Sequence, residues 1–256
     1  MLSKPRFLCI ALLRFLIMSM LRFDLEPLKT LFPEGIPRNS FIVVAGEGGS
    51  GKSILLSVFA KSILQLGEPV LYLALDDDPK TVVQQLKSLG VDVLEYVKQK
   101  LFFIVDGYSF RIRGSEPRLS VSVISKVNPQ NIEQVFESLL AIVTDLGIED
   151  RGLIAIDSLN EFLFYYSNDV QSLVEYIKNV RANFSKARNV LTIATLHTST
   201  ALAKELLSSI EHCVDGIILT ERIQQEPSSS SNVVWRVMVK RMKGVKHNLN
   251  WVSYSI

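Results

Sequence analysis

The stretch Phe41-Ile42-Val43-Val44-Ala45-Gly46-Glu47-Gly48-Gly49-Ser50-Gly51-Lys52-Ser53 decides the fold of this chain. Its first five residues form an apolar run typical of a buried strand, and the rest matches the phosphate-binding P-loop pattern. Glycines let backbone N–H groups turn toward a triphosphate, Lys52 can reach the β- and γ-phosphate oxygens, and the Ser53 hydroxyl can bind Mg²⁺. The stretch therefore predicts a nucleoside triphosphate site where a strand passes into a helix.

A second pattern overlaps the first, because the same loop also spells G-x-G-x-x-G and Asp76 closes the next apolar run. That spacing is typical of dinucleotide-binding sites. It leaves Lys52 and Ser53 without a role, whereas a triphosphate site uses both and also needs an acid at the end of a later apolar strand. Asp157, at the end of Leu-Ile-Ala-Ile-Asp, supplies that acid, so we favour a nucleoside triphosphate over NAD.

The composition favours one main α/β domain, since the chain has 256 residues, of which 48% are hydrophobic and 21% charged. A formal net charge of +2 is too mild to indicate a nucleic-acid-binding protein, and it does not exclude one. The two cysteines, Cys9 and Cys213, are far apart and form neither a disulfide framework nor a metal cluster. We therefore expect a reducing, cytoplasmic location.

The first 21 residues differ from the rest, because they are apolar apart from a few basic residues. They make a poor transmembrane span, since Arg14 would lie near the middle of the bilayer, and they lack the cleavage site of a secretory signal. Two interpretations stay open, a start codon assigned too early and an anchoring N-terminal helix. We expect no stable membrane insertion, and we divide the chain into this segment, 1–21, and one domain, 22–256.

Apolar runs separated by helical patterns predict a doubly wound, mostly parallel sheet covered on both faces. The runs that we expect to form these strands are 41–45, 70–75, 101–105, 153–156 and 191–196. After residue 215 the alternation stops, and three strand-like segments without intervening helices predict C-terminal antiparallel β-hairpins; these are 216–220, 233–242 and 251–256. Two stretches, 111–130 and 224–232, are expected to be long irregular loops.

In this order the motifs resemble those of the RecA superfamily, and most closely its KaiC-like ATPases and archaeal RadA (recombinase) paralogues. The resemblance spans about residues 25 to 256. It includes the lead-in at 31–40, the strand and acid pair at 71–79, and the Val-Asp-Gly step at 214–216. It implies a RecA-like α/β fold, an ATPase activity, and ATP and Mg²⁺ as cofactors.

The residues expected to bind the nucleotide are those of the loop and the start of its helix. Phosphoryl transfer depends mainly on positioning and on neutralising charge, which assigns Lys52 to the phosphates and assigns Ser53 and Asp157 to the metal. The full set expected to contact the nucleotide is Gly46, Glu47, Gly48, Gly49, Ser50, Gly51, Lys52, Ser53 and Ile54.

Asp76, with Asp77 as the alternate, stands where the resemblance implies a glutamate pair that orients the attacking water. Aspartate is one methylene shorter, so hydrolysis is expected to be slow. An alternative explanation is that Asp77 or Asp78 caps the helix that follows Pro79. His197 follows the run 191–196, where the family carries a polar residue that senses the γ-phosphate; a structural histidine is the alternative.

The segment 239–247 resembles a basic KaiC-like element, in which Arg241 and Lys243 take the positions that reach the γ-phosphate of the adjacent subunit. Such residues stabilise transition-state charge only when subunits assemble. Lys243 in place of arginine loses the planar, bidentate grip. The alternative is a solvated basic strand edge that discourages aggregation.

The resemblance implies an accessory recombinase paralogue in DNA repair or recombination, with slow ATP hydrolysis coupled to assembly or to a partner. The expected partners are further copies in a hexamer or filament, or a RecA/RadA-type protein, with single-stranded DNA the weakest candidate. The alternative is a nucleotide-switched interaction or signalling module with little hydrolysis and no DNA binding.

The DNA expectation depends on two loops, 160–168 and 198–203, neither of which is basic. Aromatic side chains could stack on bases, but they belong as readily to a core or a subunit interface. The aromatic and basic candidates are Phe162, Phe164, Tyr165, Tyr166, Arg111, Arg113 and Arg118.

Overall fold

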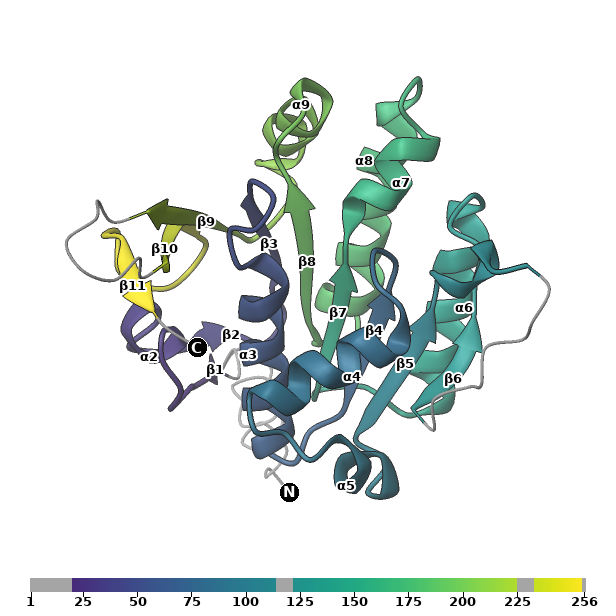
Figure 1. The fold of residues 1–256 in the computed structure, drawn as a ribbon, viewed down its shortest axis with the longest axis horizontal. Helices are drawn as coiled ribbons and strands as arrows, with labels where there is room; N and C mark the ends of the chain where they lie inside the picture. The colour runs from purple at the N-terminus through teal and green to yellow at the C-terminus, as the bar shows by residue number, and fades with distance from the viewer. Residues whose placement is uncertain (1–19, 114–121, 225–232, 255–256) are drawn as a thin grey trace, which may run out of the picture.

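The computed structural model describes residues 20–113, 122–224 and 233–254, and its dominant element is a nine-stranded sheet (Figure 1). The strands are β3 (Phe41–Gly46), β4 (Val70–Ala74), β5 (Phe102–Asp106), β6 (Val123–Lys126), β7 (Leu153–Asp157), β8 (Leu191–His197), β9 (Gly216–Gln224), β10 (Val233–Met242) and β11 (Val252–Tyr254). In space they follow the order β11-β10-β9-β3-β8-β7-β4-β5-β6. Every pairing from β9 to β6 is parallel, whereas β10 pairs antiparallel with both β9 and β11.

This topology confirms the predicted fold class, a doubly wound, mostly parallel sheet with C-terminal antiparallel strands. The helices of the described residues are α2 (Leu28–Leu31), α3 (Lys52–Gln65), α4 (Pro79–Ser88), α5 (Val93–Lys98), α6 (Ile132–Asp145), α7 (Leu159–Tyr165), α8 (Val170–Val180) and α9 (Ala201–Ile210). A short 3₁₀ turn covers Ser109–Arg111 and a π-helical turn covers Arg181–Lys186. A separate antiparallel pair joins β1 (Met20–Leu21) to β2 (Ile36–Pro37).

Both faces of the sheet are buried, and each has its own core. In β3 the side chains alternate, so that Ile42 and Val44 join the core of α3, while Phe41, Val43 and Ala45 join the core of α8 and α9. Figure 1 shows α3 and α4 in front of the sheet and α8 behind it. Such double coverage explains why the parallel strands are continuous apolar runs.

One expectation about irregular segments changes in the structure. The stretch 111–130 contains the edge strand β6, so the prediction of a long loop was wrong there. Only four residues form this strand and their side chains are alternately half-buried and exposed, which is too short a pattern to recognise in the sequence. Residues 114–121 and 225–232 lie outside the described residues, as does the apolar segment 1–21 except for Met20–Leu21. Among the described helices, none is long and apolar enough to cross a bilayer.

The starts of β3 and β9 are fixed to one another by a buried carboxylate. The Asp215 side chain is 5% exposed, and its Oδ2 accepts from the backbone N–H of Phe41 at 3.0 Å and from Arg181 Nε at 3.0 Å. Its Oδ1 accepts from Arg181 Nη2 at 2.8 Å and from Lys186 Nζ at 3.1 Å. Burial alone raises the pKa of Asp215, but the bonds from Arg181, Phe41 and Lys186 outweigh it and hold this pKa below its usual value.

Asp215→Asn should lower the free energy of unfolding by about 3 kcal/mol at pH 7, because it removes the charge that Arg181 and Lys186 neutralise. The folded-state pKa lies below the unfolded one, so this stabilisation is complete above the ordinary pKa of 3.8 and is lost as pH falls through the lower folded value. Urea unfolding of wild type and variant at pH 7 and at pH 3 measures it. Equal free energies of unfolding for wild type and variant at pH 7 would contradict the stabilising role of Asp215.

Candidate functional site

The loop between β3 and α3 is closely packed against the C-terminal strands. A Cβ on Gly46 would lie 2.4 Å from the Thr220 carbonyl oxygen, so only glycine fits there. Gly51 has φ +88°, and a Cβ on it would lie 2.7 Å from the Tyr254 hydroxyl. The Trp235 indole N–H donates to the Gly49 carbonyl at 3.2 Å. Glycine is therefore required in this loop for two reasons: the close approach of β9, β10 and β11, and the backbone shape of a phosphate site.

Lys52 lies inside this loop. The residue is 2% exposed, and its Nζ donates to the Glu47 carbonyl at 2.6 Å and to Ser50 Oγ at 3.3 Å. Burial lowers the pKa of Lys52 to about 8, although the charges of Asp157, Asp76 and Glu47 act in the other direction. Its amine is thus held at the first turn of α3, where the sequence predicts the phosphates.

Asp157 ends β7 and is held by hydroxyl groups. The residue is 5% exposed; its Oδ1 accepts from Thr195 Oγ1 at 2.5 Å and from Ser53 Oγ at 3.3 Å, and its Oδ2 accepts from the Tyr72 hydroxyl at 2.7 Å. Burial raises the pKa of Asp157, and the bonds from Thr195 and Tyr72 oppose that effect. No lysine, arginine or histidine within the described ranges forms an ion pair with this carboxylate.

This donor set fits Mg²⁺. The ion prefers oxygen ligands and is usually bound by one or two carboxylates, phosphates and water. The adjoining oxygens of Ser53 and Asp157 offer that chemistry, and the Asp157 carboxylate forms no ion pair with a described residue.

Asp76 and His197 come together at the same edge of the sheet. Asp76 Oδ2 accepts from Ser158 Oγ at 2.7 Å and lies 3.1 Å from His197 Nε2. Partial burial raises the pKa of Asp76, but the bonds from His197 and Ser158 outweigh it and hold this pKa below its usual value. Asp76 and His197, for which the sequence predicts separate roles, are therefore in direct contact.

Asp77 and Asp78 are placed differently. Asp78 caps α4, accepting from the backbone N–H groups of Lys80 and Thr81, as the capping interpretation predicts. Asp77 is exposed and makes no hydrogen bond with any described residue. Partial burial and the charges of Asp157 and Asp76 raise the pKa of Asp77. Asp76, which is held by Ser158 and His197, is the better candidate to orient the attacking water.

Arg241 and Lys243 lie at the other end of the sheet from the loop. Arg241 pairs with Ile217, near the start of β9, whereas the loop begins beside Thr220. The Arg241 guanidinium donates to the Glu211 carbonyl at 2.5 Å, and Lys243 Nζ donates to the His212 carbonyl at 3.3 Å. The structure does not bring these cations to the P-loop of their own subunit.

The segment 160–168 is mostly helix, because α7 covers Leu159–Tyr165, so the expectation of a loop was wrong. Contact of this segment with DNA stays a prediction. Ser158 caps this helix, and Phe162 is fully buried in the core, while Phe164 is 76% exposed. Arg111 forms an ion pair with Glu161, and Arg113 is exposed. Arg118 lies outside the described residues.

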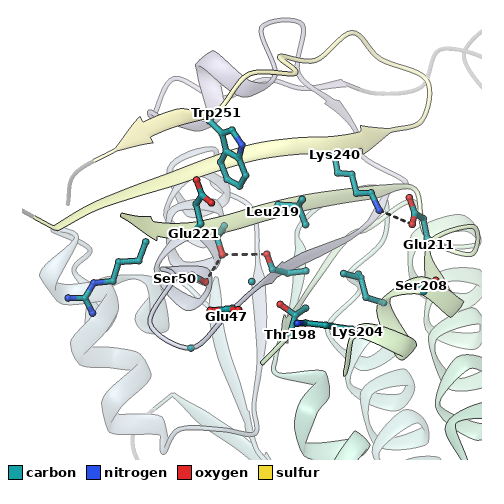
Figure 2. Close-up of a pocket in the computed structure, with 16 residues that line it drawn as sticks. Glu47, Ser50, Thr198, Lys204, Ser208, Glu211, Leu219, Glu221, Lys240 and Trp251 are labelled. Atoms are coloured by element: carbon teal, nitrogen blue, oxygen red, sulfur yellow. Dashed lines mark hydrogen bonds and ion pairs between the residues drawn. The ribbon is translucent and has the colours of Figure 1, made fainter. Parts of the chain in front are cut away.

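A separate pocket of about 640 Å³ lies on the other side of the P-loop, between β9 and α9 (Figure 2). Its lining includes Glu47 and Ser50 of the loop but neither Lys52 nor Ser53. Figure 2 shows the Lys240–Glu211 ion pair at one end, with N–O distance 2.9 Å, and Trp251 over the strands.

Several residues at the site went unrecognised in the sequence. Tyr72 is the one polar residue of β4, and Thr195 is one of three polar residues of β8, with Thr192 and His197. A hydroxyl group within a largely apolar strand is the signal that could have indicated them. Ser158 and Asn160 lie one and three residues after Asp157, but no pattern in the sequence predicts their contacts. Trp235 reaches the loop only through the pairing of the C-terminal strands.

Comparison with known proteins agrees with this geometry. The family described as "ATPase: KaiC" matches residues 23–256, so the chain belongs to the KaiC family of ATPases, within the RecA superfamily. Among curated relatives, a UPF0273 protein of Aeropyrum pernix is 25% identical over 87% of this chain and 84% of its own length. A UPF0273 protein of Pyrococcus furiosus is 26% identical with the same coverage.

The fold also matches a solved structure. A KaiC-like protein of Pyrococcus horikoshii superposes with a TM-score of 0.70 and covers 93% of this chain and 95% of its own, at 16% identity. Because the sequence identity is so low, this match supports the fold and nothing further.

Lys52→Ala should abolish binding of MgATP, because it removes the amine at the centre of the loop. Isothermal titration calorimetry with MgATP measures the affinity of the wild type and of the variant. Lys29→Ala, which changes an exposed lysine of α2, is the control. An unchanged affinity in Lys52→Ala would refute the P-loop assignment.

The affinity for MgATP should fall as pH rises through about 8. Lys52 is protonated below its pKa of about 8 and neutral above it, while the phosphates are already ionised in that range. Because the charged amine binds the phosphates best, binding above pH 8 should be accompanied by proton uptake. Calorimetry in buffers of different ionisation enthalpy detects that uptake; a constant affinity from pH 7 to 9.5 would contradict the expectation.

Proposed function

We propose that this chain binds Mg-ATP at the P-loop and hydrolyses it slowly within an assembly of subunits. The observation that carries the proposal is the convergence, at one edge of the sheet, of the Lys52 amine, the Asp157 carboxylate and the Asp76–His197 pair. Membership of the KaiC family of ATPases supports the same reaction.

Each side chain has a role that follows from its chemistry. Lys52 neutralises the phosphates, and Ser53 and Asp157 hold the metal, which when bound adds positive charge beside the transferred phosphoryl group. Asp76 orients the attacking water and accepts its proton, because its carboxylate interacts with the charges of Lys52 and Asp157 at the same edge of the sheet. His197 lies against Asp76 and senses the γ-phosphate.

Assembly supplies the missing positive charge. Asp76, Asp77 and Asp157 surround a site whose own lysine is Lys52, so a bound triphosphate is under-neutralised in one subunit. Among the described residues, the side chains of Arg241 and Lys243 donate to backbone carbonyls and to no carboxylate. We propose that they reach the γ-phosphate of a neighbouring subunit, in a hexamer, a filament or a hetero-assembly.

The biological role is proposed from resemblance, as an accessory recombinase paralogue in DNA repair. The described surface lends it little support, because Arg111 is neutralised by Glu161 and Phe162 is buried. These same contacts favour the second candidate, a nucleotide-switched interaction module that does not bind DNA.

ATP turnover by residues 20–256, with and without single-stranded DNA, tests the proposal together with Asp76→Ala and Arg241→Ala. We expect slow turnover that falls at least tenfold in both variants, with ATP binding retained. Arg22→Ala, which changes an exposed arginine, serves as the control. DNA-stimulated turnover would support the repair role, and tight binding without turnover would favour the interaction module.

A further inference from the structure

Asn160 has an arrangement of hydrogen bonds that no motif accounts for. Its Oδ1 accepts from the backbone N–H of His197 at 2.6 Å, and its Nδ2 donates to the carbonyl of the same residue at 2.9 Å. One side chain thus satisfies both backbone groups of a single residue, which is what a neighbouring strand would ordinarily do.

The position of His197 explains why such a partner is required. On the β3 side, its register partner is Gly46. On the β7 side, the ladder ends at Ile156 and Ala194, because the chain after Asp157 turns into α7. Asn160, near the start of α7, replaces the missing strand at the last residue of β8.

The same end of β8 is attached to the P-loop. The N–H of Thr198 donates to the Gly46 carbonyl at 2.9 Å, and the N–H of Gly48 donates to Ser199 Oγ at 3.3 Å. His197 is therefore held between the loop on one side and Asn160 on the other. The residue after Asp157 completes the cluster, since Ser158 Oγ accepts from the Asn160 N–H at 3.2 Å and donates to Asp76 Oδ2 at 2.7 Å.

We propose that Asn160 is a positioning residue for ATP hydrolysis, which fixes His197 so that its imidazole holds Asp76 toward the attacking water. This inference depends on the proposed function. Without the Asn160 amide, the end of β8 keeps its bonds to the loop but loses its restraint on the side of Asp76. A displacement of about 1 Å at such a group lowers a catalysed rate by up to about 100-fold.

Asn160→Ala should therefore lower kcat by about 10- to 100-fold while the Kd and KM for MgATP change less than about threefold. Asn160→Asp keeps the acceptor for the His197 N–H and should recover part of the rate. The matched control is Asn183→Ala, because Asn183 bonds to the Asn179 carbonyl on an exposed turn away from the site. Thermal unfolding of each variant identifies any general loss of structure.

A second readout does not need turnover. If Asn160 fixes the residue that senses the γ-phosphate, Asn160→Ala should reduce the ratio of ATP to ADP affinity, by no more than about threefold, whereas Asn183→Ala should leave the ratio unchanged. Absence of turnover in the wild type would refute hydrolysis, and the affinity ratio would still decide the role of Asn160. A wild-type kcat and a wild-type affinity ratio in Asn160→Ala would overturn the inference, as would equal losses of rate, binding and stability.

Discussion

The Asp157 carboxylate, buried at the end of β7, is the constraint on which the site depends. Withdrawing a charge from water is costly unless hydrogen bonds compensate for it. Here three hydroxyl groups do so, from Tyr72 on β4, Thr195 on β8 and Ser53 on α3. The carboxylate therefore requires the register of three adjacent strands and the position of the P-loop helix at once. Replacing any one hydroxyl by an apolar group would leave the charge less compensated and the metal position less defined.

The C-terminal strands give this fixed edge a second connection. Trp235 and Tyr254 donate to the carbonyls of Gly49 and Gly51, so the loop rests on β10 and β11. The strand that positions Trp235 continues to Arg241, at the opposite end of the sheet. A single strand thus joins the nucleotide loop of one subunit to Arg241, the cation proposed to serve the next, and would connect nucleotide occupancy to the proposed subunit interface.

Much of this arrangement could be predicted from the sequence, because it depends on local patterns. The P-loop, the order of strands and helices, and the acids that end β4 and β7 are each encoded in a few consecutive residues. The contacts of Asp76 with His197, and of Asn160 with His197, could not, since they join segments 121 and 37 residues apart. The expected loop at 160–168 was wrong because Ser158 caps a helix there and Phe162 enters the core, and aromatic residues by themselves do not distinguish a core from an exposed loop.

Subunit complementation is the most direct measurement of whether the nucleotide site is shared between subunits. A Lys52→Ala subunit loses its own nucleotide site but keeps Arg241. An Arg241→Ala subunit keeps its nucleotide site but can no longer supply the cation to its neighbour. If each site is completed by a neighbour, assemblies co-expressed from the two variants should hydrolyse ATP faster than either variant alone, because some interfaces pair an intact loop with an intact Arg241. Turnover no higher than the average of the two separate variants would contradict the claim that the site is shared between subunits.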